Sequence, residues 1–276
     1  ANLWPLSLAF PEAASPTIGL PTEPFDDFAN AEENTMSASV DDSRAIQDEH
    51  PTAKNKISSR KARLDALPKP KARGWIHAIT APLALANSIV LVVLAPTASI
   101  RACAVFGISA VVLFGNSAVY HLGRWSVRVH SILRRIDHSN IFLLIAGTYT
   151  PLSVALLPAD TAALVLTIVW AGALGGILLS VFKPEAPRWL YTPLYVALGW
   201  VAFWFLPDFW QAGGPAIVWL LIAGGLSYTL GALCYGLRWP NPWPKVWGFH
   251  EFFHTGTLLG YACHAVAVWL AVMSVA

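Results

Sequence analysis

The stretch TAALVLTIVWAGALGGILLSVF, residues 161–182, decides the fold class. It contains no charged residue, and a helix of 22 residues is about 33 Å long at the usual rise. That length crosses the roughly 30 Å hydrocarbon core of a bilayer. A helix at the surface of a soluble protein would keep a polar face toward water. The stretch therefore predicts a transmembrane helix.

Six other apolar stretches of similar length predict the same structure. The seven are 75–95, 102–122, 136–157, 161–182, 189–206, 215–236 and 249–273. The whole chain is 55% hydrophobic and 12% charged, whereas soluble domains carry about 25% charged residues. We therefore expect an all-α, polytopic membrane protein built as a bundle of seven transmembrane helices.

Charge divides the chain into two regions. Residues 1–73 hold eleven of the sixteen acidic residues and nine of the eighteen basic ones. We expect 1–73 to be a polar, mostly disordered region and 74–276 to be the transmembrane domain. Met36 is a plausible native start, which would make residues 1–35 an upstream extension. Nothing in the sequence indicates what residues 1–73 do.

Basic residues predict the orientation. A basic block ending at Arg73 directly precedes the first apolar stretch, as in segments that face the cytoplasm and anionic lipid. With the N-terminus cytoplasmic, the inner loops carry eight Lys and Arg and the outer loops only Arg101. The inner loops are 123–135, 183–188 and 237–248, and the outer loops are 96–101, 158–160 and 207–214. We expect a multi-pass protein of the cell (plasma) membrane that binds membrane lipid and no nucleic acid.

Two seven-helix classes fit poorly. A retinal pigment needs a lysine within a transmembrane stretch, but Lys183 and Lys245 both lie in predicted loops. A G-protein-coupled receptor has its N-terminus outside, opposite to the charge bias. The three cysteines lie in apolar runs without metal-ligand spacing and are expected to be buried free thiols.

The segment WGFHEFFHTG, residues 247–256, contains the H-E-x-x-H pattern of zinc proteases. Here it opens the last apolar stretch, at the predicted inner side. His250 and His254 are four positions apart and share one helix face, while His121 ends the second stretch at the same depth. Three imidazoles with one open position form a catalytic type of zinc site. The alternative is three separately hydrogen-bonded core histidines.

Two polar residues are expected beside this site. Ser117 lies one helical turn before His121, and Asp137 begins the third stretch at the inner side. A carboxylate near zinc can orient or deprotonate the water on the metal, and a hydroxyl can steady an oxyanion. The alternatives are a hydroxyl bonded to its own helix for Ser117 and an ion pair with Arg134 or Arg135 for Asp137.

Glu251 and His264 are harder to assign. Glu251 could act as a base, face lipid headgroups or pair with Lys245. His264 shares a face with His250 but lies about 21 Å further along the helix, so a core hydrogen bond is expected. His77 and His138 are possible neighbours of the metal ligands.

Three blocks resemble the hemolysin III family, which is related to the progestin and adipoQ receptors and more distantly to the alkaline ceramidases. They are Ser117-x-x-x-His121, RRIDHSNIFLLIAGTYTPL and GFHEFFHTGTLLGYACHAVAV, and the resemblance spans roughly residues 75–273. It implies seven helices, an inside N-terminus, and zinc held by His121, His250 and His254 with Ser117 and Asp137 around the bound water. It also implies that His264 belongs to the family pattern.

We expect a zinc-dependent hydrolase of a membrane lipid amide. Zinc would lower the pKa of its water to about 7, and Asp137 would take or relay the proton. A non-enzymatic homeostasis or sensing protein with structural zinc is the second possibility, and a pore-forming cytolysin is the third. The sequence indicates neither the lipid nor the oligomeric state.

Overall fold

The structure is a computed structural model that describes residues 70–275. The expectations for residues 1–69, including disorder and a start at Met36, lie outside the described residues. The described part of the chain is helical and has no β-strand beyond an isolated bridge between Trp243 and Trp247. Its elements are α2 (Trp75–Leu94), α3 (Ile100–Leu122), α4 (Val127–Leu156), α5 (Ala159–Phe182), α6 (Arg188–Gly199), the 3₁₀ helix η1 (Trp200–Phe205), α7 (Leu206–Leu237) and α8 (Phe249–Met273).

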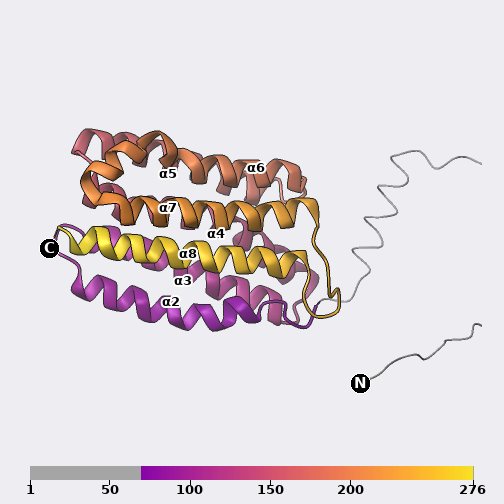
Figure 1. Ribbon diagram of the computed structural model, residues 1–276. Coiled ribbons are helices and arrows are strands. Elements are labelled where there is room, and N and C mark those ends of the chain that lie inside the picture. The colour runs from indigo at the N-terminus through magenta and orange to yellow at the C-terminus, as the bar shows by residue number, and fades with distance from the viewer. Residues whose placement is uncertain (1–69, 276) are drawn as a thin grey trace, which may run out of the picture. The chain divides into compact units, whose positions relative to one another are not determined.

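The helices run side by side along one direction (Figure 1). Chain neighbours pack as pairs: α2 with α3, α3 with α4, α4 with α5, and α7 with α8. The last helix, α8, also contacts α2 and α4. The all-α bundle expected from the sequence is thus confirmed, and α8 lies in contact with helices from both halves of the chain.

Six helices are long and apolar enough to cross a membrane, among residues 70–275. One of them is the continuous stretch Arg188–Leu237, of 50 residues, which contains α6, η1 and α7. It is interrupted at Gly214, where φ is 76° and ψ is 179°, a conformation that only glycine adopts readily. The predicted stretches 189–206 and 215–236 lie on either side of this break.

Two predicted loops are largely helical. The segment 207–214, expected as an outer loop, forms the first turns of α7 up to the break at Gly214, because Phe209 is buried there and packs in the core. The segment 123–135 was expected as an inner loop, but α4 begins at Val127. The Ser126 hydroxyl caps it by accepting a hydrogen bond from the Val129 amide at 3.4 Å.

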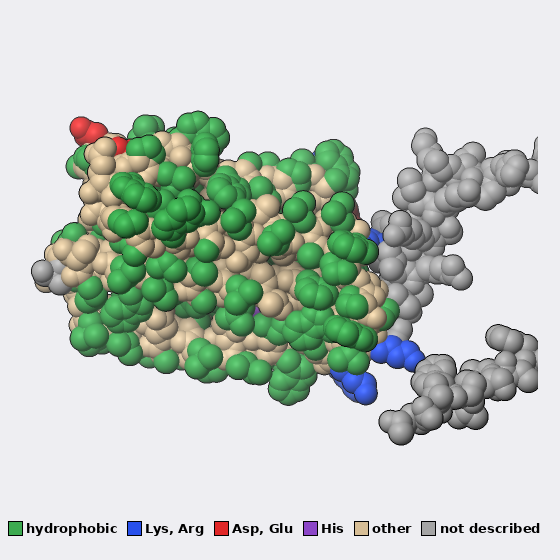
Figure 2. Space-filling model, viewed as in Figure 1, with side chains coloured by type: hydrophobic (Ala, Val, Ile, Leu, Met, Phe, Trp, Pro, Cys, Tyr) green, Lys and Arg blue, Asp and Glu red, His purple; other side chains and the backbone are tan. Residues whose placement is uncertain are grey.

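The outer surface agrees with a membrane environment. Hydrophobic side chains cover most of the face seen in Figure 2, whereas Lys and Arg lie at one end and acidic side chains at the other. Val93 and Phe182, for example, are 73% and 74% exposed. Soluble monomers rarely expose such continuous apolar surface, so the chain is a multi-pass integral membrane protein.

The α7–α8 pair is packed backbone to backbone. A Cβ atom on Gly256 would lie 2.7 Å from the Ser227 carbonyl oxygen and 2.9 Å from the Gly231 Cα. Small residues allow this approach, which is a main source of helix association in lipid. The contact holds the N-terminal half of α8, where two of the candidate ligands lie, against α7.

Candidate metal centre

His121, His250 and His254 come together at one end of the bundle. His121 lies in the last turn of α3, whereas His250 and His254 lie in the first two turns of α8. Each offers one ring nitrogen, and these three atoms lie within 4.8 Å of one another. His254 is buried and the other two are partly buried. The fold therefore brings together the three side chains expected from their spacing in the sequence.

One of the separations matches that of a metal site, and all three nitrogens lie within 4.8 Å of one another. The Nε2 atoms of His121 and His250 are 3.3 Å apart. Two nitrogens bound to one tetrahedral zinc at 2.0–2.1 Å would be about 3.3–3.4 Å apart. The ring centroid of His254 is 5.0 Å from that of His121 and 4.7 Å from that of His250. This set of three imidazoles could hold a metal ion and leave a position for another ligand.

Glu251 is not a member of this cluster and forms an ion pair with Arg73. Its other carboxylate oxygen accepts a hydrogen bond from the Gly248 amide at 2.8 Å, so the side chain also caps α8. Glu251 is 1% exposed. The expectations that it faces headgroups or pairs with Lys245 are therefore wrong, because Arg73 is its partner.

The segment before α2 is attached to the loop before α8. The Lys71 amide donates to the Lys245 carbonyl at 3.0 Å, and the Ala72 amide donates to the Val246 carbonyl at 3.2 Å. These bonds, with the Arg73 ion pair, join residues 71–73 to the start of α8. We refer to residues 71–73 as the clasp.

Directly after the clasp, Gly74 lies against a candidate ligand. Its φ is 86°, and a Cβ atom there would lie 2.8 Å from the Cβ of His121. Glycine meets both requirements, a left-handed backbone and close approach. The start of α2 thus limits where His121 can lie.

Ser117 and Asp137 lie beside the cluster but outside it. Ser117 is 2% exposed, and its hydroxyl lies near the Asp137 carboxylate. Both residues line the same cavity as His254. The alternative ion pair with Arg134 or Arg135 is not among the ion pairs found within residues 70–275.

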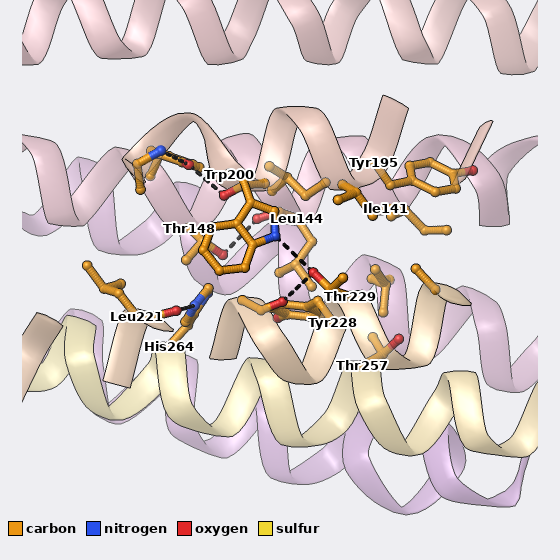
Figure 3. A pocket seen from close by; sticks show the side chains of 18 of the residues that line it. Ile141, Leu144, Thr148, Tyr195, Trp200, Leu221, Tyr228, Thr229, Thr257 and His264 are labelled. Atoms are coloured by element: carbon orange, nitrogen blue, oxygen red, sulfur yellow. Dashed lines mark hydrogen bonds between the residues drawn. The ribbon is translucent and has the colours of Figure 1, made fainter. Parts of the chain in front are cut away.

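A cavity extends from this end into the middle of the bundle. Figure 3 shows part of its lining, between Tyr195 and His264. The walls of the cavity come from α2, α3, α4, α6, η1, α7 and α8, and most of its lining is apolar. No Lys or Arg lines it within the described residues. From His254 to His264, both of which line it, the axis of α8 rises about 15 Å. The cavity therefore has a polar end and a long apolar body.

Hydrogen bonds fix the few polar groups in the body of the cavity. The Trp200 indole lies across it and donates to the Thr229 hydroxyl at 2.9 Å (Figure 3). The Tyr149 hydroxyl accepts from the Ala202 amide and donates to the Gly199 carbonyl, which satisfies backbone groups where α6 passes into the 3₁₀ helix. His264 is bonded to the Leu221 carbonyl at 3.2 Å, so its expected core hydrogen bond is confirmed.

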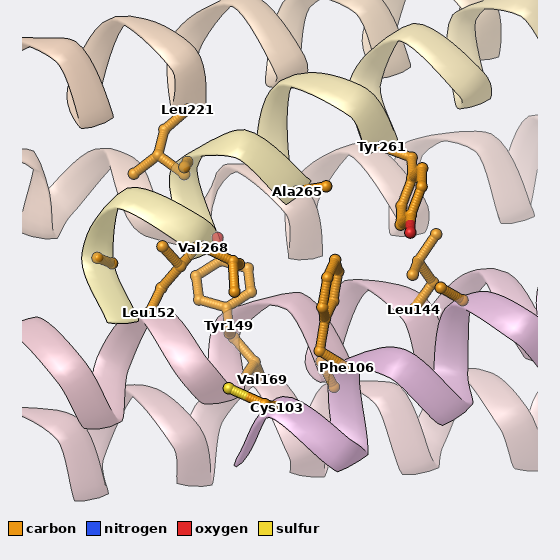
Figure 4. Close-up of a cluster of buried hydrophobic side chains, with 14 of the residues drawn as sticks. Cys103, Phe106, Leu144, Tyr149, Leu152, Val169, Leu221, Tyr261, Ala265 and Val268 are labelled. Atoms are coloured by element: carbon orange, nitrogen blue, oxygen red, sulfur yellow. The ribbon is translucent and has the colours of Figure 1, made fainter. Parts of the chain in front are cut away.

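Tightly packed side chains lie beside the cavity (Figure 4). Phe106 stacks on Tyr261 with 5.8 Å between ring centroids. Three residues belong both to this core and to the cavity wall: Tyr149, Leu152 and Leu221. The cavity is therefore bounded by a core that helix packing keeps in place.

Two residues at the site were not assigned from the sequence. Arg73 was one member of the basic block, and no local pattern links it to Glu251. His77 was only a possible neighbour, yet its ring stacks on His254 with 3.9 Å between centroids. Its signal in the sequence was a histidine within the first helical turn of the first apolar stretch.

Known proteins share this sequence pattern. A family model described as "Haemolysin-III related" matches residues 66–265. That range contains the three histidines, Ser117 and Asp137. The cluster thus lies within the matched region.

Individual relatives agree with the family match. The chain is 33% identical to a hemolysin-3 homolog of Bacillus subtilis (strain 168) over 158 residues, which are 57% of this chain and 71% of the relative. It is 31% identical to hemolysin-3 of Bacillus cereus over 190 residues, 67% of this chain and 84% of that protein. It is also 29% identical to the adiponectin receptor protein of Drosophila melanogaster over 167 residues, 54% of this chain and 37% of that protein.

Proposed function

Because the chain belongs to the haemolysin-III-related family, we propose that it is a zinc-dependent hydrolase of a membrane lipid amide. The observation that carries the proposal is a three-histidine cluster next to a carboxylate at the polar end of a long apolar cavity. In the proposed arrangement seven helices cross the cell membrane, with the N-terminus in the cytoplasm.

The break at Gly214 supports seven crossings. Its backbone conformation interrupts the stretch Arg188–Leu237, and in Figure 1 the chain runs out along α6 and returns along the rest of α7. If Arg188–Leu237 crosses the membrane twice, the six candidate spans become seven crossings. The same break leaves the basic loops and the histidine cluster at one end, as the positive-inside rule requires of a cytoplasmic face.

The donor set supports zinc. Zinc binds imidazole nitrogen, and catalytic sites use three protein ligands with an open position, which His121, His250 and His254 would provide. Zinc bound there would supply a Lewis acid that polarises a carbonyl and makes water acidic near neutral pH.

Asp137 and Ser117 would handle the proton and the carbonyl. Asp137 would take a proton from the attacking water and return it to the leaving nitrogen, so that an amide and water become a fatty acid and an amine. Ser117, near the same carboxylate, would orient it and donate a hydrogen bond toward the carbonyl oxygen. The apolar body of the cavity would hold the acyl chain.

The test is hydrolysis by the purified full chain of ceramides that differ in acyl length, with release of fatty acid as the readout. We expect turnover that falls at least a hundredfold in His250→Ala and in Asp137→Asn. Gly115→Ala is the control, since nothing lies within 4 Å of the added methyl. Turnover unaffected by either site variant would sink the proposal.

A non-enzymatic role with structural zinc has one observation in its favour. His121 is on α3 and His250 on α8, so a bound ion would cross-link two helices. For this role, metal removal lowers the melting temperature although no ceramide is hydrolysed. Two of the relatives carry a hemolysin name, and dye release from liposomes at low protein concentration would support pore formation instead.

A further inference from the structure

His77 is a fourth histidine at the centre, and it has no assigned role. It lies on α2, is 3% exposed, and lines the cavity together with Ser117, Asp137 and His254. Neither of its ring nitrogens makes a hydrogen bond of good geometry among the described residues, and the nearest polar group is the His254 backbone. An imidazole carries one donor and one acceptor when neutral, and burying both without a partner is unfavourable.

The orientation of His77 argues against a fourth metal ligand. Its ring lies nearly parallel to that of His254, with 4° between the planes and 3.9 Å between the centroids. A metal ion lies close to the plane of each imidazole that binds it, about 2.0–2.1 Å from the nitrogen. Two stacked, parallel rings do not converge on one such point. His77 is also outside the group of three whose nitrogens lie together.

The ring is held rigidly where it lies. Besides the stack on His254, it makes an edge contact with Phe114, at 5.0 Å between centroids and 83° between planes. Two aromatic contacts in different directions fix both the position and the tilt of the imidazole. A rigid donor at the polar end of a cavity is a typical ligand-recognition group.

From this geometry we propose that His77 binds the ligand: a ring nitrogen donates a hydrogen bond to the carbonyl or carboxylate oxygen of a lipid headgroup seated among His77, Ser117, Asp137 and His254. The inference rests on the proposed metal centre but not on hydrolysis. The ligand class follows from the lining, because one carboxylate and no Lys or Arg disfavour a phosphate and suit an amide or a single carboxylate.

The test uses the full chain, loaded with cobalt(II) in place of zinc, and acetate as the probe. Acetate binding is followed by the visible absorption of cobalt. His77→Phe keeps a stacking ring and removes the hydrogen bond, so it is expected to bind one cobalt per chain and acetate about tenfold more weakly, the effect of losing one hydrogen bond. His77→Asn restores a donor and is expected to recover most of the affinity.

Gly115→Ala is the control, since Gly115 does not line the cavity and nothing lies within 4 Å of the added methyl group. Its acetate affinity is expected to equal that of the wild type. His77→Leu replaces His77→Phe if the latter does not fold, with the same weakening expected. Unchanged acetate affinity in a cobalt-loaded His77→Phe or His77→Leu overturns the proposal. Loss of cobalt from these two variants, with cobalt kept by the control, also overturns it, because His77 would then be needed to hold the metal. A wild-type chain that binds neither cobalt nor zinc overturns the metal centre as well.

Discussion

Arg73 and Glu251 form an ion pair between residues 178 positions apart in the sequence. The pair joins the clasp to the first turn of α8, and Glu251 at the same time caps that helix through the Gly248 amide. His250 and His254 flank Glu251 on either side. The carboxylate within the H-E-x-x-H pattern thus holds the helix that presents the candidate ligands, and it is not one of the clustered groups.

Loss of the Glu251 charge is expected to destabilise the protein. Glu251→Ala leaves Arg73 without its partner at a largely buried site, and removal of one member of a buried pair typically costs about 3–5 kcal/mol. Thermal unfolding of purified protein would measure the change. Glu185→Ala is the control, because Glu185 is exposed in the loop before α6 and its removal is expected to change stability little. Equal melting temperatures for the two variants would contradict a structural role for the pair.

An apolar replacement of both partners separates the structural role from a catalytic one. The double variant Arg73→Met/Glu251→Leu leaves no unpaired charge, so most of the lost stability should return. It is also expected to keep one metal ion per chain, because neither residue belongs to the three-histidine cluster. Metal analysis of the folded double variant checks this, and a metal-free result would show that the pair does more than hold α8.

Gly74→Ala is expected to disturb both the fold and the cluster. A left-handed backbone costs an alanine about 1–2 kcal/mol, and the new methyl group would lie 2.8 Å from the Cβ of His121. We expect a lower melting temperature and weaker metal binding in competition with a chelator. Gly115→Ala, on α3 with open space around it, should be neutral or slightly stabilising. If Gly74→Ala bound metal as tightly as Gly115→Ala, the start of α2 would not limit the position of His121.

The helices and the three-histidine cluster could be predicted because both depend on patterns among residues that are close in the sequence. The helices follow from long apolar runs, and the pairing of His250 with His254 follows from their i, i+4 spacing at a helix start. Because successive helices cross the membrane in alternating directions, His121 is expected at the same end as His250. Loop boundaries were less accurate, since apolar residues such as Phe209 are buried and extend a helix into a predicted loop.

Contacts between distant residues could not be predicted in this way. Arg73 resembles the other basic residues before α2, and only the folded chain places it against Glu251. The stack of His77 on His254 likewise depends on the packing of α2 against α8. Hydropathy places both residues near the inner end of the bundle but does not specify which neighbour each one has.

Metal removal is expected to lower stability. An ion that binds only the folded state, present at about a thousand times its dissociation constant, stabilises by about 4 kcal/mol, which corresponds to a shift on the order of ten degrees in melting temperature for a domain of this size. A chelator should therefore lower the melting temperature of the wild type and leave that of His250→Ala unchanged. An equal chelator effect on both proteins would locate the ion elsewhere.

The orientation can be tested with introduced cysteines. With the N-terminus in the cytoplasm, Arg101→Cys lies outside and Arg124→Cys inside. A membrane-impermeant maleimide added to intact cells should label only the Arg101 variant, and permeabilised cells should show both. The three native cysteines, partly or fully buried, are first replaced by alanine. Labelling of Arg124→Cys in intact cells would reverse the proposed topology.

Gly256→Ala should show how far the metal centre depends on the α7–α8 contact. The added methyl group would meet the Ser227 carbonyl oxygen at 2.7 Å, and backbone atoms cannot rotate away as a side chain can. Overpacking of this kind costs about 1–3 kcal/mol, so we expect a melting temperature lower by several degrees. Since His254 lies two residues away, the helix shift should also weaken metal binding. Gly175→Ala on α5, with nothing within 4 Å of the new methyl, is the matched control, and equal stability of the two variants would mean that α7 and α8 are not held together by this contact.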